Sequence, residues 1–368
     1  MNSRVSSRAL CFLLFVFGFG QLYGQSLRMI MPPYLQAATT NSIMVLVEST
    51  TADTVFVEYG SSTSYGHIAT TKSFERTSEG TFVHNVLVSG LLPNTEYHYR
   101  MHDGGSVSED ASFRTAPDPG TPFRFAWLAD FRMNVSVHDS IAELAAGYRP
   151  VMSLYGGDLC YNSSYAAFKE QFFRPNELAL IARVPFYNTP GNHERWSENT
   201  RAFTESPASG SGKQEYFSFD YGDVHVLVLN NEVPYNEGSP QFQFAQKDLR
   251  QTARTWKIVA AHKPAYCAGG HGEDSLMKVM TTKIFEPNKV DLVLGGHSHF
   301  FQHNLVNGVH HFVLGSVGAP LYNPKYASYT IKSAKEYDFG IFDVSPTTLS
   351  MKVYNEKNAV LDSLILTK

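Results

Sequence analysis

Hydrophobic and polar positions divide the chain into two parts with different periodicities. Between about residues 28 and 116, short runs rich in Val, Thr, Tyr and Phe are separated by Pro, Asn, Gly and Ser, and no helical period occurs. These runs cover residues 42–48, 54–59, 82–88 and 96–102. Short strands at this spacing predict a β-sandwich of about 90 residues.

From residue 123 onward, apolar runs alternate with amphipathic segments. The runs at 123–128, 151–155, 184–188, 224–229, 258–261 and 290–294 predict strands. Helices are predicted near 138–148, 165–173, 241–252 and 276–285. Several runs are continuously apolar, which is typical of strands buried on both faces. The second part is therefore predicted to be an α/β domain with helices covering a largely parallel sheet or sheets.

Two further segments complete the predicted organisation. Arg4 and Arg8 come before an apolar stretch of about a dozen residues, which is too short to span a membrane and typical of a signal peptide. Residues 117–122 contain three prolines and predict a stiff joint that holds the sandwich against the second domain. The predicted boundaries are a signal peptide (1–25), a sandwich (26–116), a linker (117–122) and an α/β domain (123–368).

Composition excludes some partners. The chain is 43% hydrophobic and 17% charged, as in an ordinary globular protein, and its net charge of −4 offers no electrostatic footprint for nucleic acid. No second apolar stretch approaches spanning length, so we expect an exported protein without a membrane span in the mature chain. Cys160 and Cys267 remain after the signal peptide, and a disulfide and two buried thiols are both open.

Polar residues that commonly bind metals follow almost every predicted strand of the second domain. One such residue alone is usually a helix cap, a turn former or a satisfied loop residue. Their recurrence at successive strand ends indicates a site, because ligand sites in open α/β sheets form outside the carboxyl ends of strands. The residues are Asp130, Asp158, Tyr161, Asn192, His193, His262, His297 and His299.

These side chains suit a pair of metal ions. Carboxylate, phenolate and amide oxygens together with imidazole nitrogens favour iron, manganese and zinc over softer metals. Two ions about 3.5–4 Å apart can stabilise both the attacking and the leaving oxygen of an in-line displacement. One carboxylate has to bridge such ions, and Asp158 is placed to do so.

The order of motifs resembles the calcineurin-like metallophosphoesterases. The matching segments are Asp130, 157–161 (GDLCY), 191–194 (GNHE), 259–262 (VAAH) and 296–299 (GHSH). Segment 92–100 (LPNTEYHYR) resembles the signature of fibronectin type III domains, in which a Tyr near a strand start ties the preceding corner to the backbone. Tyr161 after the second Asp, with such a domain in front, makes the chain similar to a purple acid phosphatase.

The resemblance implies a ligand set and a reaction. Asp130, Asp158, Tyr161 and His299 would bind Fe(III), and Asp158, Asn192, His262 and His297 a divalent iron, zinc or manganese ion. His193 and His271 would bind substrate and donate a proton or hydrogen bonds to the leaving oxygen. The implied function is a secreted acid phosphatase that hydrolyses small phosphate monoesters with a metal-bound hydroxide. A phosphodiesterase or nucleotide-cleaving enzyme on the same centre, and a non-catalytic exported binding protein, stay open as alternatives.

The chain departs from the family pattern at two positions. Arg132 stands where the family has Gly or a metal-binding His, and Gly272 stands where a second His often follows His271. Arg132 cannot ligate metal, and two interpretations remain: it binds the phosphate of the substrate, or it pairs with a carboxylate such as Asp139. We expect structural roles for His225, His303, His310 and His311, and expect Glu194 to orient His193.

Overall fold

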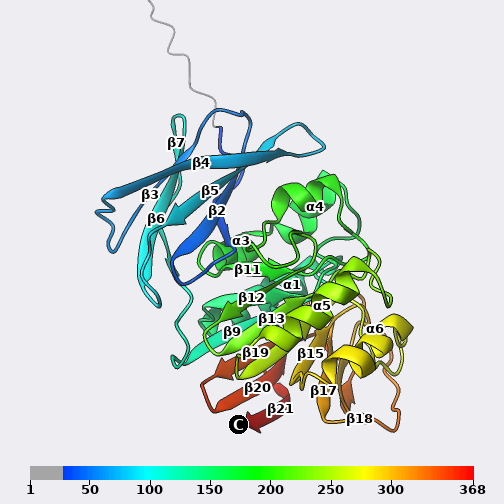
Figure 1. Ribbon diagram of the computed structural model, residues 1–368. Helices are drawn as coiled ribbons and strands as arrows, with labels where there is room; N and C mark the ends of the chain where they lie inside the picture. The colour runs from blue at the N-terminus through cyan, green and yellow to red at the C-terminus, as the bar shows by residue number, and fades with distance from the viewer. Residues whose placement is uncertain (1–27) are drawn as a thin grey trace, which may run out of the picture.

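The computed structural model describes residues 28–368, so the predicted signal peptide lies outside the described residues. Strands β1–β8 form an N-terminal sandwich, drawn in blue and cyan in Figure 1. The four predicted strands are present as β2, β3, β5 and β6, and β4 pairs with both β5 and β3. The strands are β1 (Tyr34–Gln36), β2 (Ser42–Ser49), β3 (Phe56–Gly60), β4 (His67–Arg76), β5 (Phe82–Ser89), β6 (Glu96–Asp103), β7 (Ser106–Val107) and β8 (Ala111–Arg114).

The corner before β6 is tied by a tyrosine. The backbone N–H of Leu92 donates a hydrogen bond of 3.0 Å to the hydroxyl of Tyr97, near the start of the strand. This is the contact that the resemblance to fibronectin type III domains implies. Behind it, the sandwich core contains Val45, Val86 and Phe113.

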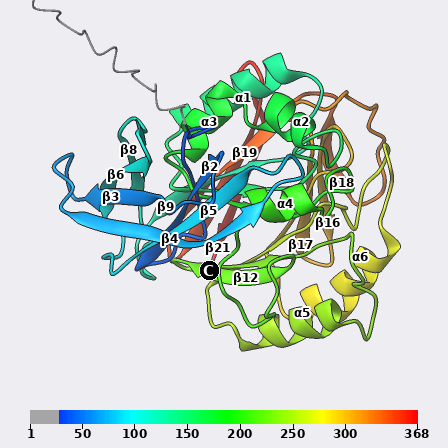
Figure 2. The same ribbon diagram turned by 90° about the horizontal axis from the view of Figure 1, so that it is seen from above.

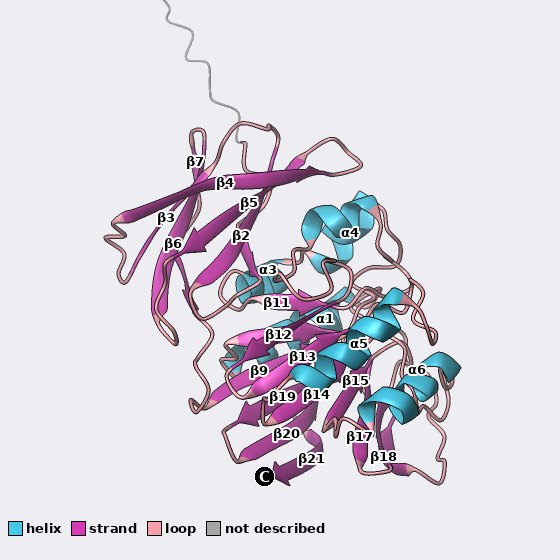
Figure 3. Cartoon of the chain, in the orientation of Figure 1, coloured by secondary structure: helices cyan, strands magenta, loops and turns pink. Residues whose placement is uncertain are grey.

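The second part contains two mixed sheets (Figure 3). One sheet has the order β21-β20-β19-β9-β10-β11 and the other β12-β13-β14-β15-β17-β16-β18. Strands β9–β11 of the first sheet and β13, β14, β15 and β17 of the second are parallel, as predicted, whereas the remaining strands of both sheets pair antiparallel. The strands are β9 (Phe123–Leu128), β10 (Met152–Tyr155), β11 (Phe186–Asn188), β12 (Phe217–Tyr221), β13 (Val224–Val228), β14 (Trp256–Ala260), β15 (Leu292–Gly295), β16 (Phe301–Val306), β17 (Val309–Leu314), β18 (Thr330–Ala334), β19 (Asp338–Val344), β20 (Thr348–Asn355) and β21 (Val360–Thr367).

Side chains alternate along β9 between two cores. Phe125 and Trp127 lie in the core between the two sheets, whereas Ala126 and Leu128 lie in the core on the other face of their sheet. Both faces are thus buried from residue 125 to residue 128, which explains why this stretch of β9 is continuously apolar.

Helices cover the outer faces of the two sheets, with α1 and α3 on one side and α5 and α6 on the other (Figure 2). Helix α5 begins where Ser239 accepts a hydrogen bond from the N–H of Phe242 and Pro240 occupies the first turn. The helices are α1 (Val135–Gly147), α2 (Tyr165–Ala167), α3 (Pro175–Ile181), α4 (Glu198–Phe203), α5 (Pro240–Gln251) and α6 (Ser275–Met280), with π-helical turns at Phe168–Phe172 and Thr281–Phe285.

The sandwich is held against the second part, as the proline-rich joint predicts. Strand β1 pairs with β11, and buried hydroxyls cross the junction: Tyr187 donates to the carbonyl of Ala38 and Tyr99 to that of Ala182, both at 2.7 Å. In residues 28–368, no helix is long and apolar enough to cross a membrane. Cys160 and Cys267 are buried free thiols, which favours the second of the two interpretations left open for them.

Candidate metal centre

The predicted ligand residues follow the carboxyl ends of strands from both sheets. Asp130 follows β9, Asp158 follows β10 and Asn192 follows β11 in one sheet. In the other sheet, His262 follows β14, and His297 and His299 follow β15. The structure brings these six residues together as two groups that share Asp158.

The first ligand group is Asp130, Asp158 and His299. Each offers a ligand atom, these atoms lie within 4.8 Å of one another, and all three residues are buried. Nε2 of His299 lies 3.5 Å from Oδ1 of Asp130. Nδ1 of His299 donates to the carbonyl of Pro320 at 2.8 Å, so Nε2 faces the group as an acceptor.

The second ligand group is Asp158, Asn192, His262 and His297. Nε2 of His262 lies 3.1 Å from Oδ1 of Asn192, 3.1 Å from Nδ1 of His297 and 3.4 Å from Oδ1 of Asp158. Nδ1 of His262 donates to the carbonyl of Gly156 at 2.7 Å, which again leaves Nε2 as the free nitrogen. Nε2 of His262 therefore lies within 3.4 Å of a ligand atom from each of the other three residues.

The backbone is strained at three of these residues. Asp130, Asp158 and His297 have φ angles of 59°, 52° and 68°, in the left-handed region that costs a non-glycine residue about 1–3 kcal/mol. Hydrogen bonds stabilise this conformation: the N–H of Asp130 donates to Gly157 at 2.9 Å and that of His297 donates to Oδ2 of Asp130 at 2.9 Å. The ligand backbones are thus fixed by the surrounding fold.

Glycines make room for the carboxylates. A Cβ on Gly296 would lie 2.3 Å from Oδ2 of Asp130, and one on Gly191 would lie 2.3 Å from Oδ1 of Asp158. Backbone therefore approaches both carboxylates more closely than any side chain allows.

The charges of the two groups are compatible with metal ions. Burial alone would raise the pKa of Asp158, but His262, His193 and Arg132 outweigh it and lower the pKa. Burial, followed by the charge of His262, lowers the pKa of His297, so its ring is neutral. Oδ1 of Asp130 is buried and makes no hydrogen bond in the described part of the chain. A cation would pair with the ionised carboxylate, bind the lone pair of the neutral imidazole and contact the oxygen that lacks a hydrogen bond.

Three other predicted residues border the two groups. Tyr161 is 50% exposed, and its ring lies 5.4 Å from that of His193. Nδ1 of His193 donates to the carbonyl of Tyr161 at 2.6 Å, and Nε2 lies 3.7 Å from Oδ2 of Asp158. The ring of His271 stacks on that of His297 at 4.3 Å, so both predicted substrate histidines adjoin the ligands.

Arg132 lies inside the site. Its guanidinium is bonded to Asp158 and His299, and Asp139 pairs instead with Arg174 at 2.8 Å. The proposed pairing of Arg132 with Asp139 is therefore wrong, because Asp139 already has a partner in Arg174. A carboxylate does bind Arg132, but it belongs to the ligand set.

Known families match both parts of the chain. Residues 123–301 match the calcineurin-like phosphoesterase family and residues 33–115 match the purple acid phosphatase N-terminal domain. The chain belongs to the purple acid phosphatases. Purple acid phosphatase 23 of Arabidopsis thaliana is 27% identical over 305 residues, which are 72% of this chain and 66% of the relative. Purple acid phosphatase 21 of the same plant is 29% identical over 236 residues, or 60% and 53% of the two chains.

The fold has a solved counterpart. The purple acid phosphatase isolated from seeds of yellow lupin (Lupinus luteus) superimposes with a TM-score of 0.78 and 20% sequence identity, over 91% of this chain and 74% of that one. The chain spans between 53% and 66% of the length of the two Arabidopsis relatives.

Sequence reasoning missed one residue of the site, Tyr322, and gave Glu194 another role than the one observed. The ring of Tyr322 stacks on that of His299 at 4.2 Å, and its hydroxyl lies 3.3 Å from Nε2 of His271. Glu194 accepts from the N–H of Gly191 at 2.8 Å, so it holds the loop backbone; the expectation that it orients His193 is wrong. Burial and then the charge of Asp158 raise the pKa of Glu194 to about 8. Tyr322 does not directly follow a strand, so the search for metal-binding residue types at strand ends did not find it.

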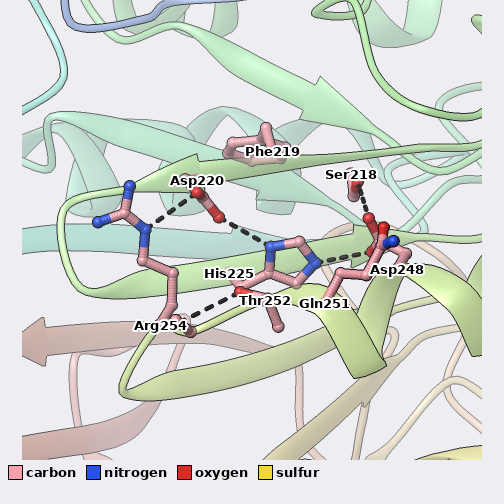
Figure 4. A pocket seen from close by; sticks show the side chains of 9 residues that line it. Ser218, Phe219, Asp220, His225, Asp248, Gln251, Thr252 and Arg254 are labelled. Carbon is pink, nitrogen blue, oxygen red and sulfur yellow. Dashed lines mark hydrogen bonds and ion pairs between the residues drawn. The ribbon is translucent and has the colours of Figure 1, made fainter.

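A second polar cluster lies apart from the ligands, in a cavity of about 470 Å³ between α5 and β12–β13. His225 lies between Asp220 and Asp248, and Arg254 pairs with Asp220 at 2.9 Å (Figure 4). Two carboxylates and two cations balance in charge, and each ring nitrogen of His225 has a partner. The cluster is consistent with the structural role expected for His225.

Proposed function

We propose that this protein is an exported phosphatase that hydrolyses phosphate monoesters at a binuclear metal centre. The observation that carries the proposal is the position of Asp158. Its Oδ1 lies 3.4 Å from Nε2 of His262 in the second ligand group, and its Oδ2 is turned toward the first, where it accepts from Arg132. A carboxylate that offers one oxygen to each group suits two ions held side by side.

The donor sets suit two different ions. Asp130, Asp158, Tyr161 and His299 would hold Fe(III), and Asp158 with the amide and imidazole groups of the second ligand group would hold divalent iron, zinc or manganese. The orphaned Oδ1 of Asp130 supports the first assignment. When bound, the ions would supply an activated water and neutralise charge on the phosphoryl oxygens.

His193 is the proposed proton donor to the leaving oxygen. Its Nδ1–H is occupied by the carbonyl of Tyr161, which leaves Nε2 to carry the exchangeable proton toward the site. Burial, and then the neighbouring charge of His299, lower the pKa of His271 and favour its neutral ring. A neutral His271 suits hydrogen bonding to the substrate, and the guanidinium of Arg132 can bind phosphoryl oxygens through two N–H groups.

The substrate class is tested by comparing p-nitrophenyl phosphate with bis-p-nitrophenyl phosphate on the metal-loaded protein. We expect a higher kcat/KM for the monoester, and His262→Ala, which lacks a proposed ligand, provides the inactive reference. Faster cleavage of the diester would indicate a phosphodiesterase. Absence of turnover with metal bound would indicate a binding protein.

The proposal that the protein is exported depends on the predicted signal peptide, residues 1–25. N-terminal sequencing of the exported protein tests whether this segment is removed.

The role of His193 has its own test. An alkoxide leaving group needs a proton in the transition state, whereas p-nitrophenolate departs readily without one. His193→Asn should therefore reduce kcat far more for an alkyl phosphate than for p-nitrophenyl phosphate. His67→Asn changes an exposed histidine of the sandwich and should alter neither rate. Equal losses on both substrates would exclude proton donation by His193.

A further inference from the structure

The guanidinium of Arg132 occupies the lone pairs of the first ligand group. Its Nε donates to Oδ2 of Asp158 at 3.2 Å, and one terminal nitrogen lies 3.0 Å from Nε2 of His299. The Arg132 residue is only 6% exposed. These two acceptor atoms are the ones through which Asp158 and His299 would hold an ion.

Arg132 also supplies a permanent positive charge beside the buried carboxylate of Asp158. Asp130 and Asp158 are fully buried, and two carboxylates removed from water are strongly destabilised unless a cation compensates them. Within residues 28–368, Arg132 is the only Lys or Arg in an ion pair with either carboxylate. An arginine stays protonated at every relevant pH, so this compensation does not depend on the solution.

The second ligand group has no such occupant. The atoms around Nε2 of His262 are Oδ1 of Asn192, Nδ1 of His297 and Oδ1 of Asp158, and none of them accepts from a lysine or arginine in the described chain. An ion can enter there without displacing a side chain. At the first ligand group, Nε2 of His299 has a single lone pair, which cannot bind both an ion and an N–H group, so an ion bound by His299 requires the terminal N–H of Arg132 to leave.

We propose that Arg132 is an internal competitor for the first metal position, which makes the two positions fill in order, the second ligand group before the first. This inference rests on the proposed function, since it presumes that both groups bind ions. The competition also connects the two ways in which Arg132 can act. The side chain compensates Asp158 before the ion binds, and after its displacement it is free to bind phosphate.

Titration of the metal-free protein with Mn²⁺ tests the order, with binding followed by calorimetry and by electron paramagnetic resonance. The wild type should bind a first equivalent that gives the signal of an isolated Mn²⁺ ion, and a second equivalent with a distinctly weaker Kd. Arg132→Gly, which removes the competitor, should tighten the second step at least about tenfold and give a spin-coupled pair at lower Mn²⁺ concentration.

Three further variants keep the test decisive. Arg132→Gln removes the charge at similar length in case Gly loosens the loop, and it should also tighten the second step. Arg132→Lys retains a cation and should stay close to the wild type. Arg250→Gln is the matched control, because Arg250 is an exposed arginine in the last turn of α5, away from both ligand groups.

The outcomes separate this inference from the proposed function. An unchanged second step in both Arg132→Gly and Arg132→Gln would overturn the competition while two-ion binding stands. A merely structural arginine would lower the unfolding temperature of these variants without moving the second Kd, and that result also overturns it. Absence of Mn²⁺ binding in every variant would overturn the proposed function and this inference together.

Discussion

Raising the pH from about 6 to about 10 should destabilise the protein through one side chain, His225. Nδ1 of its ring contacts Asp220 at 2.8 Å and Nε2 contacts Asp248 at 2.7 Å, from the β12–β13 hairpin and from α5 (Figure 4). Burial alone would lower the pKa of His225, but the hydrogen bonds to Asp220 and Asp248 outweigh it and raise the pKa to about 9.

The magnitude follows from the difference between the folded and unfolded pKa. A rise of the pKa from the ordinary histidine value of 6.5 to about 9 corresponds to about 3 kcal/mol in favour of the folded state. Because the folded pKa is the higher one, this contribution is fully present below pH about 6.5 and is lost as the pH rises through about 9. When His225 loses its proton, its ring becomes neutral, and both ion pairs that connect α5 to the β12–β13 hairpin are lost.

Urea unfolding of wild type and His225→Phe at both pH values measures the effect. The wild type should lose about 3 kcal/mol more unfolding free energy between the two pH values than the variant, since only the wild type carries the titrating ring. His67→Gln alters an exposed histidine and should follow the wild type. If wild type and His225→Phe lose the same unfolding free energy, the ion pairs do not stabilise the fold and the reasoning fails.

Three other predictions concern the site and the junction. Gly296→Ala places a Cβ 2.3 Å from Oδ2 of Asp130, so metal content at the first position should fall and kcat should decrease about 100-fold, with an unchanged circular dichroism spectrum. His262→Ala should remove the ion of the second ligand group and abolish turnover, and wild-type metal content would contradict the ligand assignment. Tyr187→Phe removes a buried 2.7 Å hydrogen bond to Ala38 and should lower the unfolding free energy by about 1–2 kcal/mol in urea titrations.

The sequence predicts the central strands well because their environment dictates their composition. A strand segment buried on both faces is usually continuously apolar, and residues 125–128 of β9, residues 258–260 of β14 and the whole of β15 follow that rule. Strand β4 escaped prediction because eight of its ten residues, HIATTKSFER, are exposed, so its sequence resembles that of a loop. The short helices α3 and α4 escaped because six or seven residues do not establish a helical period.

For the candidate ligands, too, the sequence predicts one part of the arrangement and only the folded chain shows the other. Which residue types end the strands is visible in the sequence, and the topology of the sheets then brings six of them together. The left-handed backbone at Asp130 and His297 is not visible, because hydrogen bonds from residues far along the chain hold it. The position of Arg132 is equally hidden, since its contact with His299 joins residues 167 positions apart.

The loop that carries Tyr161 is also held in place by residues that are distant in the sequence. Although Tyr161 is half exposed, its backbone N–H donates to the side chain of Gln171 at 2.8 Å, and the backbone carbonyl of Gln171 accepts from Nδ1 of His138 at 3.0 Å. Nε2 of His138 contacts Glu177 at 2.9 Å, and both of these side chains are fully buried. A buried, hydrogen-bonded His138–Glu177 pair therefore anchors, through Gln171, the loop whose Tyr161 carbonyl orients His193. The orientation of the proposed proton donor depends on residues that no strand-end motif contains, and for that reason it can be derived only from the folded chain.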